Sequence, residues 1–196
     1  TTSAPVQPTP PPTQTNTAPS AQDDSAVTQN GAEVRVSVLA NDSDSQNDTL
    51  SITAVTQPAA GSVSIDGDVV VFTPQDSAWA GTASFSYEVS DSELTSTGNV
   101  SVTVSQAFSF SGIALVPDAS AAKVQLHVGN EMLEADINGD NSFSIDYVTE
   151  NLDNKSMRFR VTENNVDLIV SASTPLLDIA RKRGTGLSYS ITEHPE

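Results

Sequence analysis

Residues 34–54 read VRVSVLANDSDSQNDTLSITA, two alternating segments separated by a polar, acidic loop. In the first segment the valines at positions 34, 36 and 38 face one way, and the polar residues between them face the other. Leu50, Ile52 and Ala54 repeat this alternation after the loop. A period of two residues is typical of a half-buried β-strand. The stretch therefore predicts two strands joined by a loop.

The same alternation continues along the first half of the chain. Further alternating segments lie at 63–65, 69–72, 85–89 and 100–104. Asp66-Gly67 separates two of them and predicts a β-hairpin, because this pair adopts the tight turn that joins antiparallel strands. Six or seven short strands within roughly 85 residues are typical of an immunoglobulin-like sandwich. We therefore predict an all-β fold, with a first sandwich over residues 21–106.

The second half of the chain has the same texture but a different charge. Its alternating segments lie at 108–110, 124–128, 133–137, 143–145, 157–161 and 166–170. Ser105 to Ala107 is the expected junction, because residues 21–106 hold 12 acids and one base whereas 107–196 hold 13 acids and seven bases. We predict a second β-sandwich over residues 107–196.

The two ends of the chain are expected to differ from the sandwiches. Residues 1–20 hold no charged residue and six of the eleven prolines, which predicts an extended linker. Near the other end, Thr174 can cap a helix that starts at Pro175 and that Gly184 stops, so we expect a short helix near 175–183. The chain begins without Met and shows no signal peptide, so we expect a mature or excised part of a longer protein.

The composition argues against several classes of function. The sequence has no cysteine, which excludes disulfides, thiolate zinc sites and cysteine nucleophiles. Its net charge of −17 at pH 7 opposes binding to nucleic acid and to anionic membranes, which attract basic surfaces. No run of about 18 apolar residues is present, so we expect no membrane insertion. An acidic surface attracts cations, although solubility alone also accounts for it.

The loop at 41–48 is rich in oxygen donors, the ligands that calcium prefers. Asp91 follows another alternating segment, and the pair Asp23-Asp24 precedes the first one. If these segments meet at one end of the sandwich, their carboxylates repel one another unless a cation lies between them. The alternative is a set of solvated turn residues that hydrogen bond to their own backbone.

Residues 21–104 carry a set of markers: the acidic pair at 23–24, VLANDSD, QPAAGSV, FTP, WAG and FSYEVSD. Together they resemble the cadherin-like and immunoglobulin-like tandem repeats of bacterial surface and adhesion proteins. The resemblance implies a secreted β-sandwich without catalytic activity, often stiffened by calcium. Similar repeats commonly have Asp-Gly where this chain has Gln46-Asn47, but Asn also tolerates the left-handed backbone. Carried over by position, the resemblance implies calcium ligation by Asp24, Asn41, Asp42, Asp44, Asp48 and Asp91.

Part of the second half, residues 108–170, resembles the carboxypeptidase regulatory-like, or transthyretin-like, domain through FSGIAL, AAKVQLHVG and ADINGDNSFSI. The resemblance implies an accessory domain. Asp136, Asn138 and Asp140 have the spacing of an EF-hand calcium loop, but that loop needs Gly and Glu where this chain has Asn141 and Tyr147. We interpret these acids as a hairpin turn.

Residues for catalysis are sparse. His127 is expected on the exposed face of a strand and His194 lies near the terminus, so neither fits the oriented base of a Ser-His-Asp triad. Trp79 is predicted to be a core residue rather than a platform for a sugar ring. An intramolecular isopeptide bond from Lys123 or Lys155 to an Asn is a further alternative.

The sequence therefore favours a non-catalytic, calcium-binding adhesion or spacer module, on the outside of a bacterial cell or secreted from it. The alternative is an accessory carbohydrate-binding module of a secreted polysaccharide-degrading enzyme, which predicts a row of exposed aromatic residues. Aromatic residues make up only 5% of the chain. The expected partners are neighbouring domains of a longer chain and a surface glycan or protein ligand, and the chain is expected to be a monomer that does not bind nucleic acid.

Overall fold

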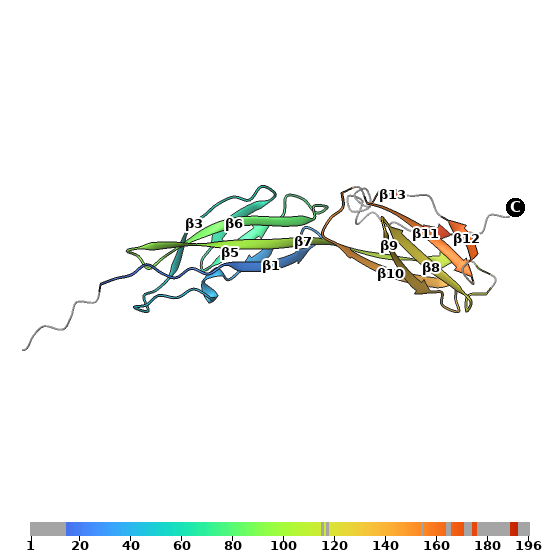
Figure 1. Ribbon diagram of the computed structural model, residues 1–196, viewed down its shortest axis with the longest axis horizontal. Coiled ribbons are helices and arrows are strands. Elements are labelled where there is room, and N and C mark those ends of the chain that lie inside the picture. Colours follow the sequence, from blue (N-terminus) through green and yellow to red (C-terminus); the bar gives the residue numbers. More distant parts are fainter. Residues whose placement is uncertain are drawn as a thin grey trace, which may run out of the picture.

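The computed structural model describes residues 15–114, 116, 118–153, 155–163, 166–170, 174–175 and 189–191. Nearly all regular structure in these residues is β-strand, so the predicted all-β class is confirmed. The described residues bury two hydrophobic clusters, and we call the two parts of the chain around them the N-terminal lobe and the C-terminal lobe. The two lobes lie end to end (Figure 1).

The N-terminal lobe consists of two sheets packed around the first cluster. The first sheet has the order β1-β7-β6-β3, and the second has the order β2-β5-β4. The valines and aromatic residues of alternating positions face inward, which is what the period of two predicts. The strands are β1 (Asp24–Gln29), β2 (Val34–Val36), β3 (Ser51–Val55), β4 (Ser62–Asp66), β5 (Val69–Thr73), β6 (Gly81–Ser90) and the first half of β7 (Thr95–Ala114).

The C-terminal lobe repeats this two-sheet plan around the second cluster. One sheet pairs the second half of β7 with β10 and β14, and the other has the order β12-β11-β8-β9 with β13 beside β11. In its core, the ring of Phe159 contacts two other rings: its centroid lies 5.6 Å from that of Phe110 and 5.9 Å from that of Phe143. The strands are β8 (Ala122–Val128), β9 (Glu131–Asp136), β10 (Ser142–Thr149), β11 (Ser156–Glu163), β12 (Val166–Val170), β13 (Thr174–Pro175) and β14 (Tyr189–Ile191).

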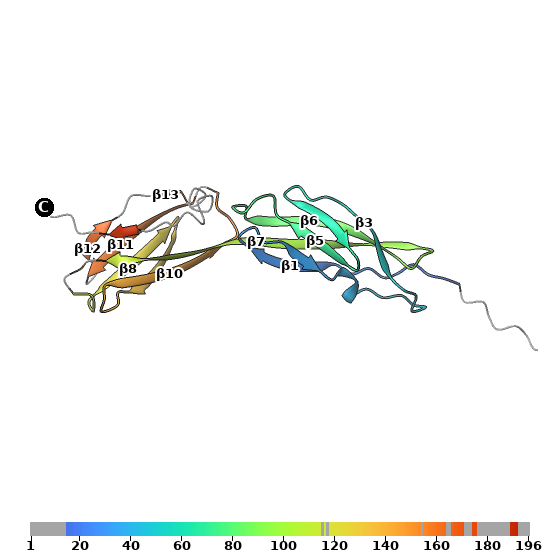
Figure 2. The ribbon, with the colours of Figure 1, turned by 180° about the vertical axis from the view of Figure 1, so that it is seen from behind.

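One strand, β7, belongs to both lobes. Residues 95–104 pair with β6, and residues 106–113 of the same strand pair with β10. Figure 1 and Figure 2 show this strand running from one lobe into the other without a break. The junction expected at 105–107 thus lies inside a strand. The even-numbered residues are the buried ones both at 100–104 and at 108–110, as in one continuous strand.

Two expectations about local structure were wrong. The alternation through Val38 predicts a strand, but β2 ends at Val36 and a 3-10 turn, η1 (Val38–Ala40), follows it and leaves Val38 fully buried. The helix expected at 175–183 does not begin as predicted: its expected cap, Thr174, and its first residue, Pro175, form β13 against Met157 and Ser156. A neighbouring strand outweighs the weak local preference for a helix cap there. Residues 176–183 lie outside the described part.

The hairpin prediction is confirmed. Gly67 has a φ of 62°, and β4 and β5 pair antiparallel on either side of it. A positive φ at this place is the reason that the turn needs glycine. Within the described residues, no helix is long and apolar enough to cross a membrane.

Candidate metal centre

The predicted ligands gather at the end of the N-terminal lobe that lies away from the C-terminal lobe, and we call this region, residues 15–24, 41–48 and 91–94, the acidic pole. Asp24 is the first residue of β1, the loop 41–48 follows η1, and Asp91 follows β6. Residues 15–20, which the sequence assigns to the linker, run beside the loop: the backbone groups of Ser20 and Ser43 exchange hydrogen bonds of 2.7 Å and 3.2 Å. The pole is therefore assembled from three separate segments of the chain.

Tyr87 organises the inner part of the pole. Its side chain is 1% exposed, and its hydroxyl oxygen lies 3.0 Å from both carboxylate oxygens of Asp42 and 2.8 Å from the carbonyl oxygen of Gln22. A hydroxyl has one proton, so it can donate to only one of these acceptors at a time. The inner pole thus holds more oxygen acceptors than Tyr87 can satisfy.

Asp24 is the second acid of the inner pole. Burial and, next, the charge of Asp42 raise the pKa of Asp24, and contacts with Tyr87 and Asn41 offset this only in part. The same surroundings raise the pKa of Tyr87: burial first, then the hydrogen bond and charge of Asp42. Oδ2 of Asp24 is buried and has no hydrogen-bond partner. A positive charge at this place would lower the cost of both carboxylates.

The loop 41–48 closes on its own central acid. Oδ1 of Asp44 accepts hydrogen bonds from the backbone N–H of Gln46 at 2.8 Å and of Asp48 at 3.1 Å. Asn47 has a φ of 58°, so it adopts the left-handed conformation that the sequence leads us to expect of it. Oδ2 of Asp44 is buried without a partner. The loop geometry is that of an Asx turn, and it leaves one carboxylate oxygen unused.

Asp91 sits in the turn between β6 and β7 and is 6% exposed. Its Oδ1 accepts hydrogen bonds from the backbone N–H of Leu94 at 2.7 Å and of Glu93 at 2.8 Å, and these bonds lower its pKa. Its Oδ2 accepts a hydrogen bond of 3.0 Å from Nδ2 of Asn16. Asp91 is thus held as a carboxylate, with its direction set by the backbone.

Asn16 is a site residue that sequence reasoning missed. Its Nδ2 contacts Asp91, while its Oδ1 is buried without a hydrogen-bond partner. Asn16 lies in the uncharged, proline-rich stretch that reads as a linker, so composition alone conceals it. The sequence offers one indication of its role: Asn16 lies a few residues before the acidic pair Asp23-Asp24. With it, Gln46, Asp48, Asp91, Ser92 and Glu93 line an open hollow of about 440 Å³.

The structure divides the six predicted ligands into two groups. Asp24 and Asp42 lie beside Tyr87, and Asn41 contacts Asp24. Asp48 and Asp91 line the hollow with Asn16. Asp44 belongs to the loop between them, and its Oδ1 accepts a hydrogen bond from the backbone N–H of Asp48. Among the described residues, no three His, Cys, Asp or Glu side chains come together in one group that could hold a metal ion. Any cation here therefore needs amide or backbone oxygens beside the carboxylates.

The acids of the C-terminal lobe are arranged differently. Oδ1 of Asp140 accepts hydrogen bonds from the backbone N–H and hydroxyl of Ser142, at 3.0 Å and 2.6 Å, and these lower its pKa. Asp136 pairs with Lys123 at 3.2 Å. The segment is a turn as predicted, but not a hairpin, since β9 pairs with β8 and β10 with β7. It crosses from one sheet to the other, and apolar residues of both strands, such as Leu133 and Ile145, pack in the same core.

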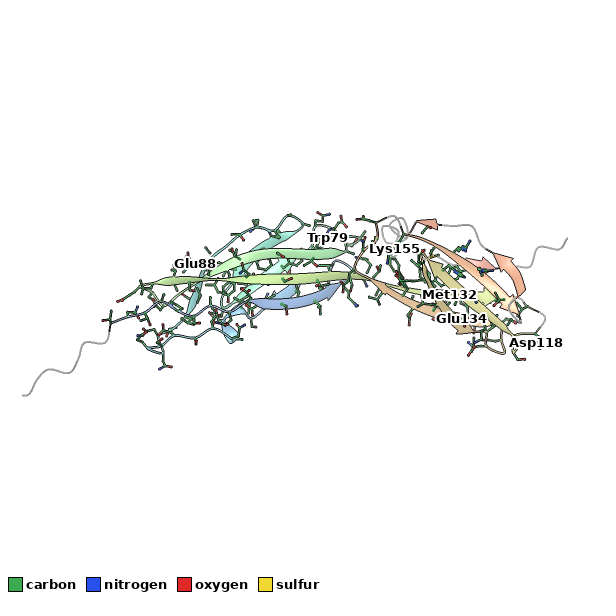
Figure 3. All side chains as sticks on the ribbon, in the orientation of Figure 1. Trp79, Glu88, Asp118, Met132, Glu134 and Lys155 are labelled. Atoms are coloured by element: carbon green, nitrogen blue, oxygen red, sulfur yellow. The ribbon has the colours of Figure 1, made fainter. Side chains whose placement is uncertain are left out.

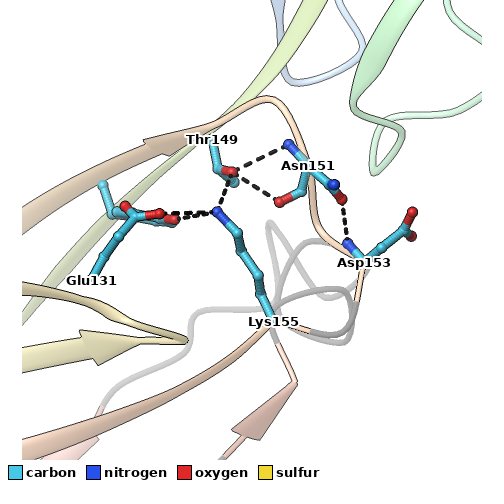
Figure 4. A network of polar contacts seen from close by, with 6 residues as sticks. Glu131, Thr149, Asn151, Asp153 and Lys155 are labelled. Carbon is cyan, nitrogen blue, oxygen red and sulfur yellow. Dashed lines mark hydrogen bonds and ion pairs between the residues drawn. The ribbon is translucent and has the colours of Figure 1, made fainter.

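The residues considered for catalysis or cross-linking have structural contacts. His127 is half-buried on the outer face of β8 opposite Arg158, and His194 lies outside the described residues. Nζ of Lys155 donates to the hydroxyl of Tyr147 at 3.0 Å, to Glu131 at 3.2 Å and to Thr149 at 3.2 Å, as Figure 4 shows in part. This network ties the start of β9 to the end of β10. Trp79 packs against the N-terminal core, as predicted.

One comparison with known families concerns the N-terminal lobe. Residues 16–103 match the family model described as bacterial Ig domain. This match supports an immunoglobulin-like fold for the N-terminal lobe. The match begins at Asn16, the residue that contacts Asp91, and covers both sheets of the lobe. A search of curated proteins found no match.

Solved structures give only distant similarities. An endo-fucoidan hydrolase from glycoside hydrolase family 107 is 15% identical with a TM-score of 0.35, and the match covers 90% of this chain and 28% of that one. Ig tandem domains of titin are 9% identical with a TM-score of 0.29, covering 92% of this chain and 100% of that one. An ectodomain fragment of ICAM-5 is 9% identical with a TM-score of 0.28, covering 91% and 52%. These similarities are too low to carry an argument about function.

Proposed function

We propose that the chain is a non-catalytic, calcium-binding spacer or adhesion module of a bacterial surface or secreted protein. One observation carries the proposal. Three side-chain oxygens, Oδ1 of Asn16, Oδ2 of Asp24 and Oδ2 of Asp44, are buried in the acidic pole without a hydrogen-bond partner. A buried oxygen of this kind costs about 1–3 kcal/mol, so a cation bound by these oxygens would stabilise the folded domain.

Calcium fits this set of donors better than other metals. All the available donors are oxygens of carboxylates, amides and the backbone, and the chain has no cysteine. Calcium is a hard cation that takes about six to eight oxygens in flexible geometry. Magnesium requires a near-octahedral arrangement, and softer metals favour nitrogen or sulfur. The raised pKa of Asp24 also indicates that the inner pole lacks positive charge.

The two groups of the pole would contribute in different ways. Asp42 and Asp24 supply charge at the inner position, with Asn41 as a neutral oxygen donor. Asp48 and Asp91 supply charge at the outer position, with Asn16 as the amide donor, and Asp44 lies in the loop between the two positions. A cation at the outer position would fix residues 15–20 against the loop and so set the direction in which the preceding chain leaves the domain. That is the mechanical role we propose.

The energetic effect should be moderate. Extracellular calcium modules typically bind with Kd near 10⁻⁴–10⁻³ M, and a ligand at about ten times its Kd adds about 1.4 kcal/mol of stability. A small domain without disulfides unfolds easily enough for this gain to be visible. The stabilisation should depend on calcium concentration and disappear with a chelator.

The test is thermal unfolding with calcium and with EGTA, followed by calorimetric titration of calcium. Calcium should raise the Tm of the natural chain and leave that of Asp44→Asn nearly unchanged. Asp140→Asn is the matched control: it removes a turn acid of the C-terminal lobe and should keep the full calcium response. Equal Tm values for the natural chain with calcium and with EGTA would overturn the proposal.

The remaining features of the proposal concern organisation and location. We infer an Ig-like sandwich and then an accessory sandwich of transthyretin-like type, outside the cell and next to further domains. Of the linker predicted over residues 1–20, residues 1–14 lie outside the described part. The match of residues 16–103 to a bacterial Ig family supports the extracellular location, since such domains are usually exposed at the surface.

No observation favours the alternative of a carbohydrate-binding module. Such a module needs exposed aromatic rings in a row. Among the aromatic residues with described side chains none is exposed: Trp79 is half-buried, and Phe72, Phe85, Tyr87, Phe108, Phe110, Phe143, Tyr147 and Phe159 are buried.

A further inference from the structure

The segment 78–80 lies between the two hydrophobic cores of the protein. Ala78 is buried in the C-terminal cluster, and Ala80 packs against that cluster too. Trp79, between them, turns the other way and packs against the N-terminal cluster. Figure 3 places Trp79 at the end of the N-terminal lobe that faces the other lobe. Three consecutive residues thus contribute alternately to both cores.

A fully buried amide side chain holds this segment in place. Gln106 is 0% exposed, and its Nε2 donates to the carbonyl oxygen of Trp79 at 2.9 Å and to that of Ser77 at 3.1 Å. Gln106 is part of β7, at the point where the strand passes from one lobe to the other. A buried amide with good partners fixes geometry, because breaking its bonds leaves polar groups unsatisfied.

The turn between β1 and β2 holds the same strand from the other side. Oδ1 of Asn30 accepts a hydrogen bond of 2.9 Å from the backbone N–H of Ala107, and the N–H of Asn30 donates to the carbonyl oxygen of Ser105 at 2.9 Å. Asn30 has a φ of 57°, in the left-handed region, and bonds to β7 through both its side chain and its backbone. Residues 105–107 are therefore held from two directions.

We infer that the junction is a locked joint, so that the two lobes move as one rigid body. Tandem domains ordinarily move relative to each other, because their linkers make few contacts. Here the connection is a paired strand, and the segment 78–80 joins both cores. No predicted calcium ligand takes part in these contacts, so the inference goes beyond the proposed function and does not rest on it.

The test is a distance measurement between two spin labels by pulsed electron paramagnetic resonance. The chain has no cysteine, so labels can be placed at will. Ser64→Cys and Ser144→Cys, both at exposed positions, place one label on each lobe, and Ser64→Cys with Ser101→Cys gives a reference pair within the N-terminal lobe. The cross-junction distribution should be about as narrow as the reference, with calcium and with EGTA. A cross-junction distribution more than about twice as wide would overturn the inference.

Variants identify the contacts that lock the joint. Gln106→Ala should widen the cross-junction distribution at least about twofold and leave the reference pair unchanged. Asn30→Gly is a milder variant that keeps the positive φ and removes only the side-chain bond, and it serves if Gln106→Ala fails to fold. Asn141→Gly is the control, because Asn141 also has a positive φ, 64°, but lies away from the junction. Unchanged widths in Asn30→Gly and in any folded Gln106→Ala would overturn the assignment.

Discussion

Two acidic segments of similar sequence, the loop 41–48 and the turn 136–141, differ in how their oxygens are satisfied. Asp140 and Asn138 in the turn bond with Ser142, and Asp136 pairs with Lys123. In the acidic pole, oxygens of Asp24 and Asp44 remain buried and unpaired. Both segments place Asp and Asn side chains within a few positions of one another, so composition alone does not separate them. What separates them is the surrounding structure, which closes over one segment and leaves the other in water.

The difference has a structural cause. The pole is covered by residues 15–20 and is built on the buried Tyr87, whereas the turn 136–141 has no segment packed over it among the described residues. An acid in water needs no partner beyond its own turn. An acid next to a buried hydroxyl loses its contact with water, and a nearby positive charge would then stabilise its ionised form.

The largest expected loss of stability comes from a substitution that places an extra atom against the ring of Tyr87. A Cβ at Gly98 would lie 2.5 Å from Cε1 of Tyr87 and 2.6 Å from its hydroxyl oxygen. Gly98→Ala should therefore cost about 2–3 kcal/mol of unfolding free energy, because a rigid buried ring has no room to move. Gly139→Ala, in the turn of the C-terminal lobe, meets no atom within 4 Å and should change stability by less than about 0.5 kcal/mol. Urea unfolding measures both, and equal costs would contradict the comparison.

A milder change removes only the hydroxyl of Tyr87. Tyr87→Phe should cost about 1–2 kcal/mol, because Asp42 and the carbonyl oxygen of Gln22 lose a buried donor. Tyr147→Phe is the matched change in the C-terminal lobe, where the lost bond is with Lys155, which keeps two other partners. It should cost about 0.5–1 kcal/mol. Denaturant titration in EGTA separates the two, and a larger loss in Tyr147→Phe would argue against the central place of Tyr87.

The smallest expected effect is a difference of sign in the dependence on pH. The folded state raises the pKa of Asp24 above 3.8 and lowers that of Asp140 below it. The folded protein therefore binds its proton at Asp24 more readily than the unfolded chain does, so ionised Asp24 costs stability as pH rises above 3.8. Asp140 contributes stability above 3.8, and this is lost as pH falls through its lowered pKa.

Two variants report this difference in EGTA. Asp24→Asn should stabilise the protein at pH 7, and the gain should shrink as the pH falls toward 4. Asp140→Asn should destabilise it at pH 7, with the loss shrinking only at more acidic pH. Urea unfolding at several pH values gives the sign of each. A loss of stability in Asp24→Asn under these conditions would show that Asp24 is already well partnered.

Much of the secondary structure could be predicted from local pattern. The alternation at 63–65 and 69–72 and the Asp66-Gly67 turn correspond to β4, β5 and their hairpin, and the left-handed Asn47 was also expected. These features depend on residues that are close together in the sequence, so the sequence pattern is enough to predict them. The pattern failed at Val38, where an apolar residue is buried from a 3-10 turn, and at Thr174, where a distant strand supplies the hydrogen bonds.

The sequence by itself determined that this protein is an acidic, cysteine-free, all-β chain whose first part is an Ig-like domain, because hydrophobic period, turn residues and composition are local properties. Only the tertiary structure decided which acids are buried, that Asn16 reaches Asp91, and that β7 joins the two lobes without a break. Those facts depend on contacts between residues far apart in the chain: Asn16 and Asp91 are 75 positions apart. Folding takes carboxylate oxygens of the pole out of water, whereas the acids of the turn 136–141 stay in contact with water. This difference arises only when the chain has folded.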